Sequence, residues 1–290
     1  MRIGTRGSAL ALAQARWVAE RLGPEVELVQ ITTLGDRGAA ALDKSRWVSE
    51  LERALLEDRI DLAVHSAKDV PTELPDGLEL VAIPPRADPR DVICGAASLG
   101  GLPAGSRIGT SSLRRAAQVR ALREDVEVSE LRGNVDTRLR KLAEGQVDAL
   151  ILAAAGLERL GRDGEAGGFL EEFVPAAGQG ALALEARVGS IEPRRLAAVS
   201  DLEATACVSA ERTLVHVLGA SCHTPVGAHA RALRDGRVTV TAWVGLPDGS
   251  AWLRDELTGD AELVGARCAE RMLAAGAADL LRQATTEAVG

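Results

Sequence analysis

Aromatic side chains are scarce in this chain of 290 residues, which has no Tyr, two Phe and four Trp. A surface that stacks nucleobases needs aromatic rings. Asp and Glu also outnumber Lys and Arg by 42 to 34, which gives a net charge of −8. Both observations argue against DNA or RNA as the main partner. Hydrophobic residues nevertheless make up 46% of the chain, so we expect a full core built from Ala, Leu and Val.

Long apolar runs are also missing. The longest, at about residues 149–157, is far shorter than the roughly 18 residues of a membrane-spanning helix. The first residues lack the basic and apolar regions of a signal peptide. Four cysteines, Cys94, Cys207, Cys222 and Cys268, show no C-x-x-C spacing, which argues against a disulfide scaffold or a zinc cluster. The sequence therefore predicts a soluble cytoplasmic protein that binds no membrane.

Short apolar runs alternate with stretches of helical period, a pattern typical of an α/β fold with a parallel sheet. The pattern occurs twice, and the two halves open with the similar sequences IGTRGS and IGTSS. The sequence therefore predicts two related α/β lobes. Their expected strands are 2–5, 26–32 and 60–65, then 107–110, 126–131 and 147–152, and their expected helices are 8–21 and 48–58, then 112–123 and 135–144.

Two punctuated segments connect the predicted lobes. Residues 84–90 (PPRADPR) contain too much proline for a helix or a central strand. Residues 175–180 (PAAGQG) precede another short strand at 181–185. Two crossings indicate that the chain leaves the first lobe, builds the second and returns, and lobes joined in this way can hinge around a ligand.

A third, α+β domain is predicted from about residue 202. Its expected elements are a helix at 204–218, an antiparallel hairpin of strands 238–244 and 251–257, and a last helix at 261–282. The predicted boundaries are 1–84 with 180–198 for the first lobe, 88–175 for the second and 202–290 for the third domain.

Cationic and hydroxyl side chains gather where the predicted strands end. In open parallel sheets ligands bind at this edge, against helix N-termini, and guanidinium groups there favour anions. So many cations in an acidic protein predict a ligand with several negative charges. The alternative is that each Ser or Thr caps a helix and each Arg is a surface charge. The segments are 5–8, 66–69, 110–115, 132–134 with Arg138, and 156–159.

Three further residues could carry chemistry. Asp69, beside Lys68, is a candidate acid, base or cation-stabilising carboxylate, although it could equally cap the turn before Val70. His65 is more simply explained as a structural histidine. Cys222 lies in a loop next to a histidine, where a thiol can be nucleophilic, but most lone cysteines are inert.

Eight segments taken together resemble the porphobilinogen deaminase family over nearly the whole chain. Their order along the chain makes the resemblance far more specific than any one motif. The segments are IGTRGSALALAQ (3–14), DLAVHSAKDVP (61–71), DPRD (88–91), GTSSLRR (109–115), LRGNVDTRL (131–139), DALILAAAGLERLG (148–161), PAAGQGALALE (175–185) and ERTLVHVLGASCHTPVG (211–227).

The resemblance implies a metal-independent, monomeric transferase of three domains, the first two similar to periplasmic binding proteins. This family condenses four porphobilinogen molecules head to tail into 1-hydroxymethylbilane and releases ammonia. Growth starts on a dipyrromethane cofactor, which a thioether would join to Cys222, and Asp69 would be the catalytic carboxylate. Each pyrrole carries an acetate and a propionate. The implied ligands of cofactor and substrate are Arg6, Ser8, Ser66, Lys68, Thr110, Ser112, Arg114, Arg115, Arg132, Arg138 and Arg159.

One region departs from the family pattern. Members usually carry a lid over the site that leads into the motif K-G-L-F-x-K-E-[IL]-E. The corresponding segment here is 43–52, in which Lys44 matches one lysine, Trp47 stands where Phe is usual and Ser49 replaces the other lysine. Lys44 and Trp47 are therefore candidate lid residues in a lid whose closure could differ.

Two other classes of protein fit parts of the pattern. A non-catalytic, two-lobed anion-binding protein would share the lobes, but it would carry no covalent adduct. A phosphoryl-transfer enzyme would share the anion-binding segments. The sequence has no phosphate loop of the type G-x-x-x-x-G-K-[ST] and no metal-ligand spacing, and dependence of the activity on Mg²⁺ would distinguish that class.

Overall fold

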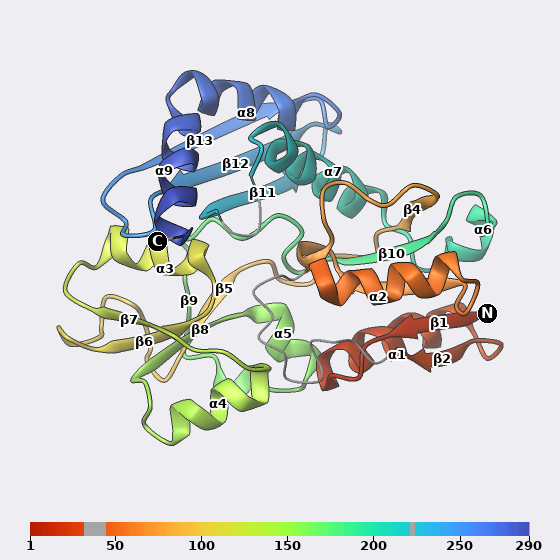
Figure 1. Ribbon diagram of the computed structural model, residues 1–290, viewed down its shortest axis with the longest axis horizontal. Helices are drawn as coiled ribbons and strands as arrows, with labels where there is room; N and C mark the ends of the chain where they lie inside the picture. The colour runs from red at the N-terminus through yellow and green to blue at the C-terminus, as the bar shows by residue number, and fades with distance from the viewer. Residues whose placement is uncertain (32–44, 221–223, 290) are drawn as a thin grey trace.

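The computed structural model describes residues 1–31, 45–220 and 224–289. Its strands form three sheets, two of five strands and one of three. Figure 1 shows them as three bodies: lobe 1 on the right, lobe 2 at the lower left and a third domain at the top. The predicted class of fold, two α/β lobes and a third domain with a small antiparallel sheet, is confirmed.

Lobe 1 contains a mixed sheet in the order β2-β1-β3-β10-β4. Side chains alternate between the two faces of β3: Leu62 and Val64 pack in one core with α1, while Ala63 packs in another with α2. The two helices therefore cover opposite faces of the sheet. The elements are β1 (Arg2–Thr5), α1 (Ala9–Leu22), β2 (Glu27–Gln30), α2 (Ser45–Leu56), β3 (Leu62–Ser66), η2 (Ala67–Asp69), β4 (Leu78–Ala82), β10 (Leu182–Arg187) and α6 (Pro193–Leu196).

Lobe 2 repeats this plan with the strand order β7-β6-β8-β5-β9. Ile108 and Ile151 lie in the core on the α3 side, whereas Leu150 and Leu152 lie in the core on the side of α4 and α5. The elements are β5 (Asp91–Cys94), β6 (Arg107–Thr110), α3 (Leu113–Leu122), β7 (Glu127–Glu130), α4 (Val135–Ala143), β8 (Ala149–Ala153), α5 (Ala154–Arg159), η3 (Asp163–Glu165) and β9 (Gly168–Phe169).

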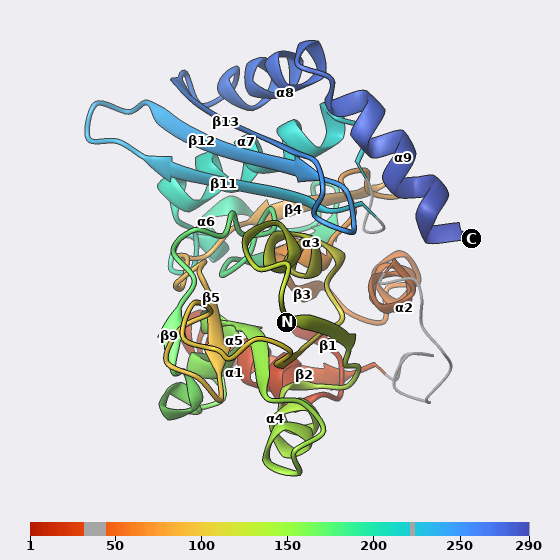
Figure 2. The same ribbon diagram turned by 90° about the vertical axis from the view of Figure 1, so that its left-hand side faces the viewer.

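The third domain packs one face of an antiparallel sheet, β11-β12-β13, against helices α7, α8 and α9. Figure 2 shows α3 of lobe 2 beneath this sheet. Arg120 of α3 donates to the carbonyl oxygen of Pro247 in the turn between β12 and β13, at 2.7 Å. The elements are α7 (Leu202–Val217), β11 (Val226–Ala232), β12 (Val238–Gly245), β13 (Trp252–Gly259), α8 (Val264–Ala274) and α9 (Ala277–Val289).

Two expectations from the sequence were wrong. The sheets of the lobes are mixed rather than parallel, because β10 runs antiparallel to β3 and β5 runs antiparallel to β8. Both reversed strands adjoin the chain crossings, so their direction depends on the return of the chain and not on a local pattern. The single helix expected at 261–282 is two helices, separated at Gly276, whose φ of +103° does not fit a helix.

Candidate functional site

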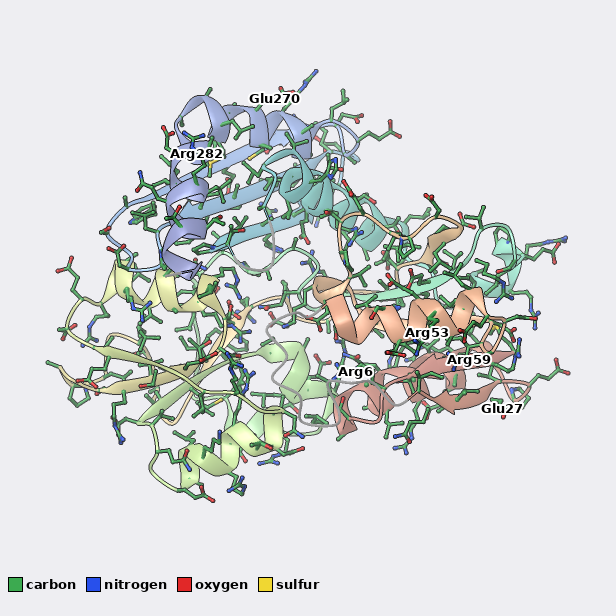
Figure 3. The ribbon with its side chains drawn as sticks, viewed as in Figure 1. Arg6, Glu27, Arg53, Arg59, Glu270 and Arg282 are labelled. Atoms are coloured by element: carbon green, nitrogen blue, oxygen red, sulfur yellow. The ribbon has the colours of Figure 1, made fainter. Side chains whose placement is uncertain are left out.

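The carboxyl ends of parallel strands bring the predicted site segments to one edge of each lobe. In lobe 1, β1 pairs in parallel with β3, so the segments after Thr5 and Ser66 lie next to each other. In lobe 2, β6 pairs in parallel with β7 and with β8, which gathers the segments after Thr110, Glu130 and Ala153. Figure 3 shows Arg6 at the end of lobe 1 that faces lobe 2.

Hydroxyl groups at these strand ends cap helices. Ser8 Oγ accepts a hydrogen bond from the backbone N–H of Ala11 at the start of α1, at 3.3 Å. Ser112 Oγ accepts one from the N–H of Arg115 at the start of α3, at 3.4 Å. For these two serines the structure therefore shows the N-cap contact that the alternative interpretation predicted.

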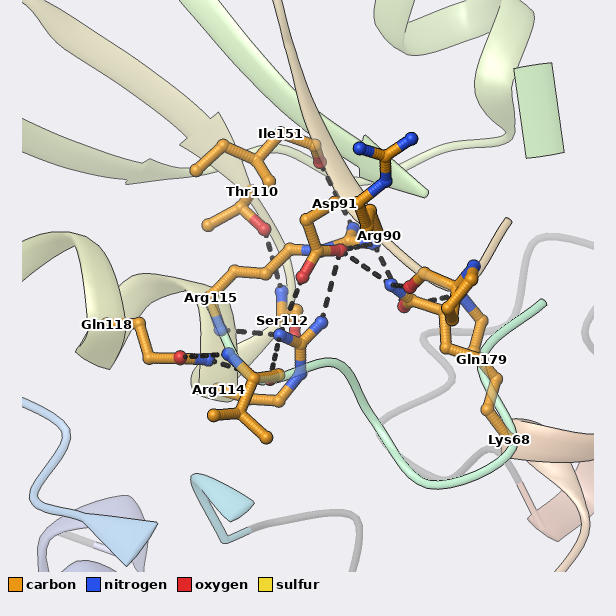
Figure 4. A network of polar contacts seen from close by, with 12 residues as sticks. Lys68, Arg90, Asp91, Thr110, Ser112, Arg114, Arg115, Gln118, Ile151 and Gln179 are labelled. Carbon is orange, nitrogen blue, oxygen red and sulfur yellow. Dashed lines mark hydrogen bonds and ion pairs between the residues drawn. The ribbon is translucent and has the colours of Figure 1, made fainter. Parts of the chain in front are cut away.

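A buried polar network joins the two lobes (Figure 4). Asp91, fully buried at the start of β5, bonds Arg114 Nη1 at 2.7 Å and Arg115 Nε at 2.8 Å. Gln179 Nε2 donates to Asp91 Oδ1 at 2.9 Å, and Gln179 Oε1 accepts from Arg115 Nη2 and from Lys68 Nζ, each at 3.4 Å. Lys68 belongs to lobe 1 and the other charged groups to lobe 2, so the network spans the seam between the lobes.

The charges in this network determine its ionisation. Burial alone would raise the pKa of Asp91, but the positive charges of Arg114 and Arg115 outweigh it and hold that pKa well below its usual range. Asp91 is therefore ionised at neutral pH. Arg114 retains a further donor, because its buried Nε has no hydrogen-bond partner among the described residues. The two guanidinium groups thus face one carboxylate, and the pair of arginines is not fully neutralised.

Two other predicted cations are desolvated and bonded to neutral oxygen atoms. Arg138 donates to Gly133 O and Ser111 Oγ, both at 2.8 Å. Burial and the nearby charge of Arg115 lower the pKa of Arg138 to about 10. Arg159, on α5, donates to Gly180 O at 2.7 Å, and burial lowers its pKa to about 10 as well. Cations in this condition favour an anionic ligand that would restore their electrostatic balance.

The remaining predicted residues differ in their surroundings. Ser66 Oγ accepts from Gln14 Nε2 at 2.9 Å, and Thr110 Oγ1 accepts from the N–H of Ser112 at 3.2 Å. Arg132 is exposed and pairs with Glu130 at 2.6 Å. Asp69 is half-buried at the end of η2, one residue after Lys68. Cys222 and Lys44 lie outside the described residues, as does the side chain of Trp47.

Sequence reasoning assigned no role to three buried residues that organise the site. Asp91 and Gln179 are the centre of the network at the seam. Glu211, on α7, is fully buried and accepts from Arg86 Nη1, from the N–H of Gly178 and from the N–H of Ala230, each at 2.6 Å. Glu211 therefore ties the third domain to both crossings. All three residues fall inside motifs that the sequence displays, but their burial is not visible there.

One pocket lies apart from this network. A pocket of about 560 Å³ lies between β4 and α7 and is lined by residues such as Leu80, Arg212 and His216, but by none of the predicted site residues. In the ranges that the structure describes, no cluster of three or more His, Cys, Asp or Glu could hold a metal ion. No described helix has the length and apolar character needed to cross a membrane.

Comparison with known proteins gives two matching family models. Residues 1–194 match the model described as "Porphobilinogen deaminase, dipyromethane cofactor binding domain". Residues 205–274 match "Porphobilinogen deaminase, C-terminal domain".

Curated relatives match over almost their whole length. A porphobilinogen deaminase of Brevibacillus brevis is 46% identical, with 99% of this chain and 98% of the relative covered. One of Thermus thermophilus is 47% identical, with 97% and 98% covered. Among solved structures, the methionine-binding protein MetQ is 14% identical, with a TM-score of 0.41 and coverage of 68% of this chain and 87% of that protein.

Proposed function

This chain belongs to the porphobilinogen deaminase family, and we propose that the residues at the seam between its lobes carry out that family's reaction, with Asp69 as the catalytic carboxylate and Cys222 as the cofactor anchor. The chain is an enzyme of tetrapyrrole biosynthesis that polymerises porphobilinogen, and residues 1–194 match the domain that binds the dipyrromethane cofactor. The cofactor, when bound, supplies the pyrrole on which the product chain grows.

The observation that carries the proposal is the group of incompletely neutralised guanidinium groups at the seam. Arg138 and Arg159 bond neutral oxygen atoms in the described part of the chain, and Arg114 and Arg115 share one carboxylate. Two linked pyrroles with their acetate and propionate groups are an anion of the kind that such donors bind. The donor set therefore fits the cofactor and the growing chain, whose negative charge increases with every pyrrole.

The predicted ligands divide by lobe. Arg6, Ser8, Ser66 and Lys68 come from lobe 1, and Thr110, Ser112, Arg114, Arg115, Arg132, Arg138 and Arg159 come from lobe 2. We propose that carboxylates bound at the seam contact both sets. Lys44 and Trp47 are proposed to belong to the lid that excludes water from this seam.

We propose that Asp69 acts on the reacting pyrrole. It ends η2, directly after the strand that carries His65 and Ser66 and beside Lys68. A carboxylate there would accept hydrogen bonds from pyrrole N–H groups and stabilise the positive charge that develops on porphobilinogen as ammonia leaves. An Asp69→Asn protein tests this role, because the substitution keeps the shape of the side chain and removes its charge.

We predict that Asp69→Asn lowers kcat about 10²–10³-fold, the usual loss when one electrostatic group that stabilises a transition state is removed. Cys222→Ser, by contrast, should abolish covalent loading. Intact mass should show that wild type and Asp69→Asn carry two linked pyrrole units and that Cys222→Ser carries none. Asp76→Asn, at an exposed position, is the matched control for turnover. Near-wild-type kcat in Asp69→Asn, or an adduct on Cys222→Ser, would refute the respective assignment.

We further propose that the enzyme is a cytoplasmic monomer with the domain boundaries predicted from its sequence. The buried thiols of Cys94, Cys207 and Cys268 are free, as is usual in a reducing compartment. The large apolar side chains that remain exposed, such as Leu56, Phe169 and Trp252, lie on different parts of the molecule, and an obligate dimer would require them to form one patch. Light scattering at micromolar concentration should give the mass of one chain.

A further inference from the structure

Gln179 lies between two glycines whose backbone conformation lets the chain pass close to its neighbours. Gly178 and Gly180 have φ values of +72° and +85°, a region that favours glycine. A Cβ on Gly178 would lie 2.9 Å from the carbonyl carbon of Ala67, beside the Lys68 turn of lobe 1, and a Cβ on Gly180 would lie 2.4 Å from Ala87 O on the other crossing. The segment 178–180 therefore runs against lobe 1 and the first crossing at once, with Gln179 between them.

The amide of Gln179 uses all its hydrogen-bonding capacity on groups from both sides of the seam. Its Nε2 donates to Pro89 O at 2.7 Å and to Asp91 Oδ1 at 2.9 Å. Its Oε1 accepts from Lys68 Nζ and from Arg115 Nη2, each at 3.4 Å. The side chain is 1% exposed, so this geometry is set by the protein interior and does not depend on solvent.

The Gln179 amide carries no charge, so it does not neutralise the cations that it bonds. Asp91 pairs with Arg114 and Arg115, and the Gln179 amide joins Arg115 to Lys68. An uncharged acceptor orients Lys68 and Arg115 without neutralising them, whereas a carboxylate at the same place would bind them as ion pairs.

We infer that Gln179 is a positioning residue, which directs the Lys68 ammonium of lobe 1 and the Arg115 guanidinium of lobe 2 toward one shared carboxylate of the bound pyrrole chain. This inference rests on the proposed roles of Lys68 and Arg115 in binding that chain. Because Gln179 lies on the second crossing, it also sets the distance between these two cations across the seam.

The test compares Gln179→Glu with Gln179→Met, using protein expressed without cofactor in cells that cannot make porphobilinogen. The apo-proteins are mixed with porphobilinogen, and intact mass follows the gain of the two-pyrrole adduct with time. We expect assembly to be about tenfold slower in Gln179→Glu, which neutralises the cations, and about threefold slower in Gln179→Met, which releases them. In the loaded proteins, the KM for porphobilinogen should rise in both variants, and it should rise more in Gln179→Glu than in Gln179→Met.

The matched control is Gln118→Met. Gln118 is also a buried glutamine, and it holds the residue before the second crossing, because its amide bonds both the N–H and the carbonyl oxygen of Val174, at 2.8 and 3.1 Å. Its amide does not share the bonds of Gln179 to Lys68 and Arg115. A purely structural role of Gln179 would give the two methionine variants the same assembly rate at equal melting temperature. The positioning role predicts a slower rate for Gln179→Met alone.

Wild type and Cys222→Ser, run in the same assay, separate this inference from the proposed function. If wild type gains no adduct, or Cys222→Ser gains one, the proposed function fails, and the inference that rests on it fails with it. If wild type loads normally and both Gln179 variants load at its rate, the positioning role alone is overturned. Should Gln179→Glu fold poorly, the comparison of Gln179→Met with Gln118→Met still decides the question.

Discussion

Buried carboxyl groups among the described residues differ in what neutralises them. Asp91 and Glu211 are fully buried, and each bonds at least one guanidinium group as well as other donors, so each stays ionised. Glu52, on α2, is 8% exposed, and its Oε1 has no hydrogen-bond partner in the described part of the chain. Burial and the negative charge of Glu185 raise the pKa of Glu52 to about 7, although the charge of His65 opposes the shift.

The pKa of Glu52 predicts a pH-dependent stability. A carboxyl group whose pKa is raised on folding stabilises the native state at low pH, and this contribution is lost as pH rises through the folded-state value. Between pH 5 and pH 8 the free energy of unfolding should therefore fall by about 2 kcal/mol because of this one group. Urea denaturation at several pH values measures the fall.

Glu52→Gln is the informative variant, because it resembles the protonated side chain and cannot titrate. It should lose most of the decline between pH 5 and pH 8. Glu50→Gln, on the same helix and paired with Arg53, should keep the wild-type slope. If the stability of Glu52→Gln declines as steeply as that of wild type, Glu52 is not the group that titrates between pH 5 and pH 8.

At the scale of elements, the turns and crossings determine how the strand ends meet. The strands of each lobe end in polar segments, but the segment 175–180 packs against lobe 1 and the first crossing through approaches at its two glycines that leave no room for a side chain. Gly178 shows this best, because its backbone lies against Ala67 and Lys68. The conformation of this crossing is therefore part of the site.

Gly178→Ala should lower the free energy of unfolding by more than the backbone conformation alone explains. A non-glycine residue at positive φ costs roughly 1–2 kcal/mol, and forcing an extra methyl group against packed atoms adds about 1–3 kcal/mol. We expect Gly178→Ala to lower the free energy of unfolding by about 3 kcal/mol and to slow cofactor assembly. Chemical denaturation measures the loss of stability, and intact mass measures the rate of cofactor assembly.

Gly189→Ala supplies the control for that measurement. Gly189 has nearly the same φ, +68°, but no atom lies within 4 Å of the position that its Cβ would take. Gly189→Ala should lower the free energy of unfolding by about 1 kcal/mol and leave the rate of cofactor assembly unchanged. Equal losses at the two glycines would show that the close approach of the crossing to Ala67 contributes nothing.

For the whole molecule, the third domain connects the two lobes. Arg212 of α7 donates to the carbonyl oxygens of Val70 and Thr72, directly after the Asp69 segment of lobe 1, at 3.0 and 3.2 Å. The turn between β12 and β13 meets α3 of lobe 2, where a Cβ on Gly249 would lie 2.5 Å from the N atom of Ala121. Glu211 joins α7 to both crossings, so the third domain contacts both lobes and both crossings.

Removing the charge of Glu211 should therefore lower the stability of the whole protein. Glu211→Gln leaves the Arg86 guanidinium group without its buried counter-charge, which costs about 3 kcal/mol or more. We expect a lower free energy of unfolding together with a larger KM for porphobilinogen. Glu203→Gln, at an exposed position in the first turn of the same helix, should change neither. A stability of Glu211→Gln within 1 kcal/mol of wild type would contradict this account.

The resemblance of eight motifs identified the family, and local pattern in the sequence was enough to predict most strands and helices of the lobes and the two crossings. The reason is that hydrophobic period, helix caps and turn residues act over a few neighbours. Strand 107–110 and the opening strand 2–5 agree with β6 and β1 at both ends. The motifs also identified the candidate residues, because the chemistry of an anion site requires particular side chains at strand ends.

Only the tertiary structure decided how those side chains are used. It reversed β5 and β10 within their sheets, capped helices with Ser8 and Ser112, and placed Arg114 and Arg115 on Asp91. It also made Gln179 and Glu211 into links between domains. These outcomes depend on burial and on contacts between residues far apart in the chain. The cost of burying a charge or a polar group depends on neighbours that no local pattern specifies.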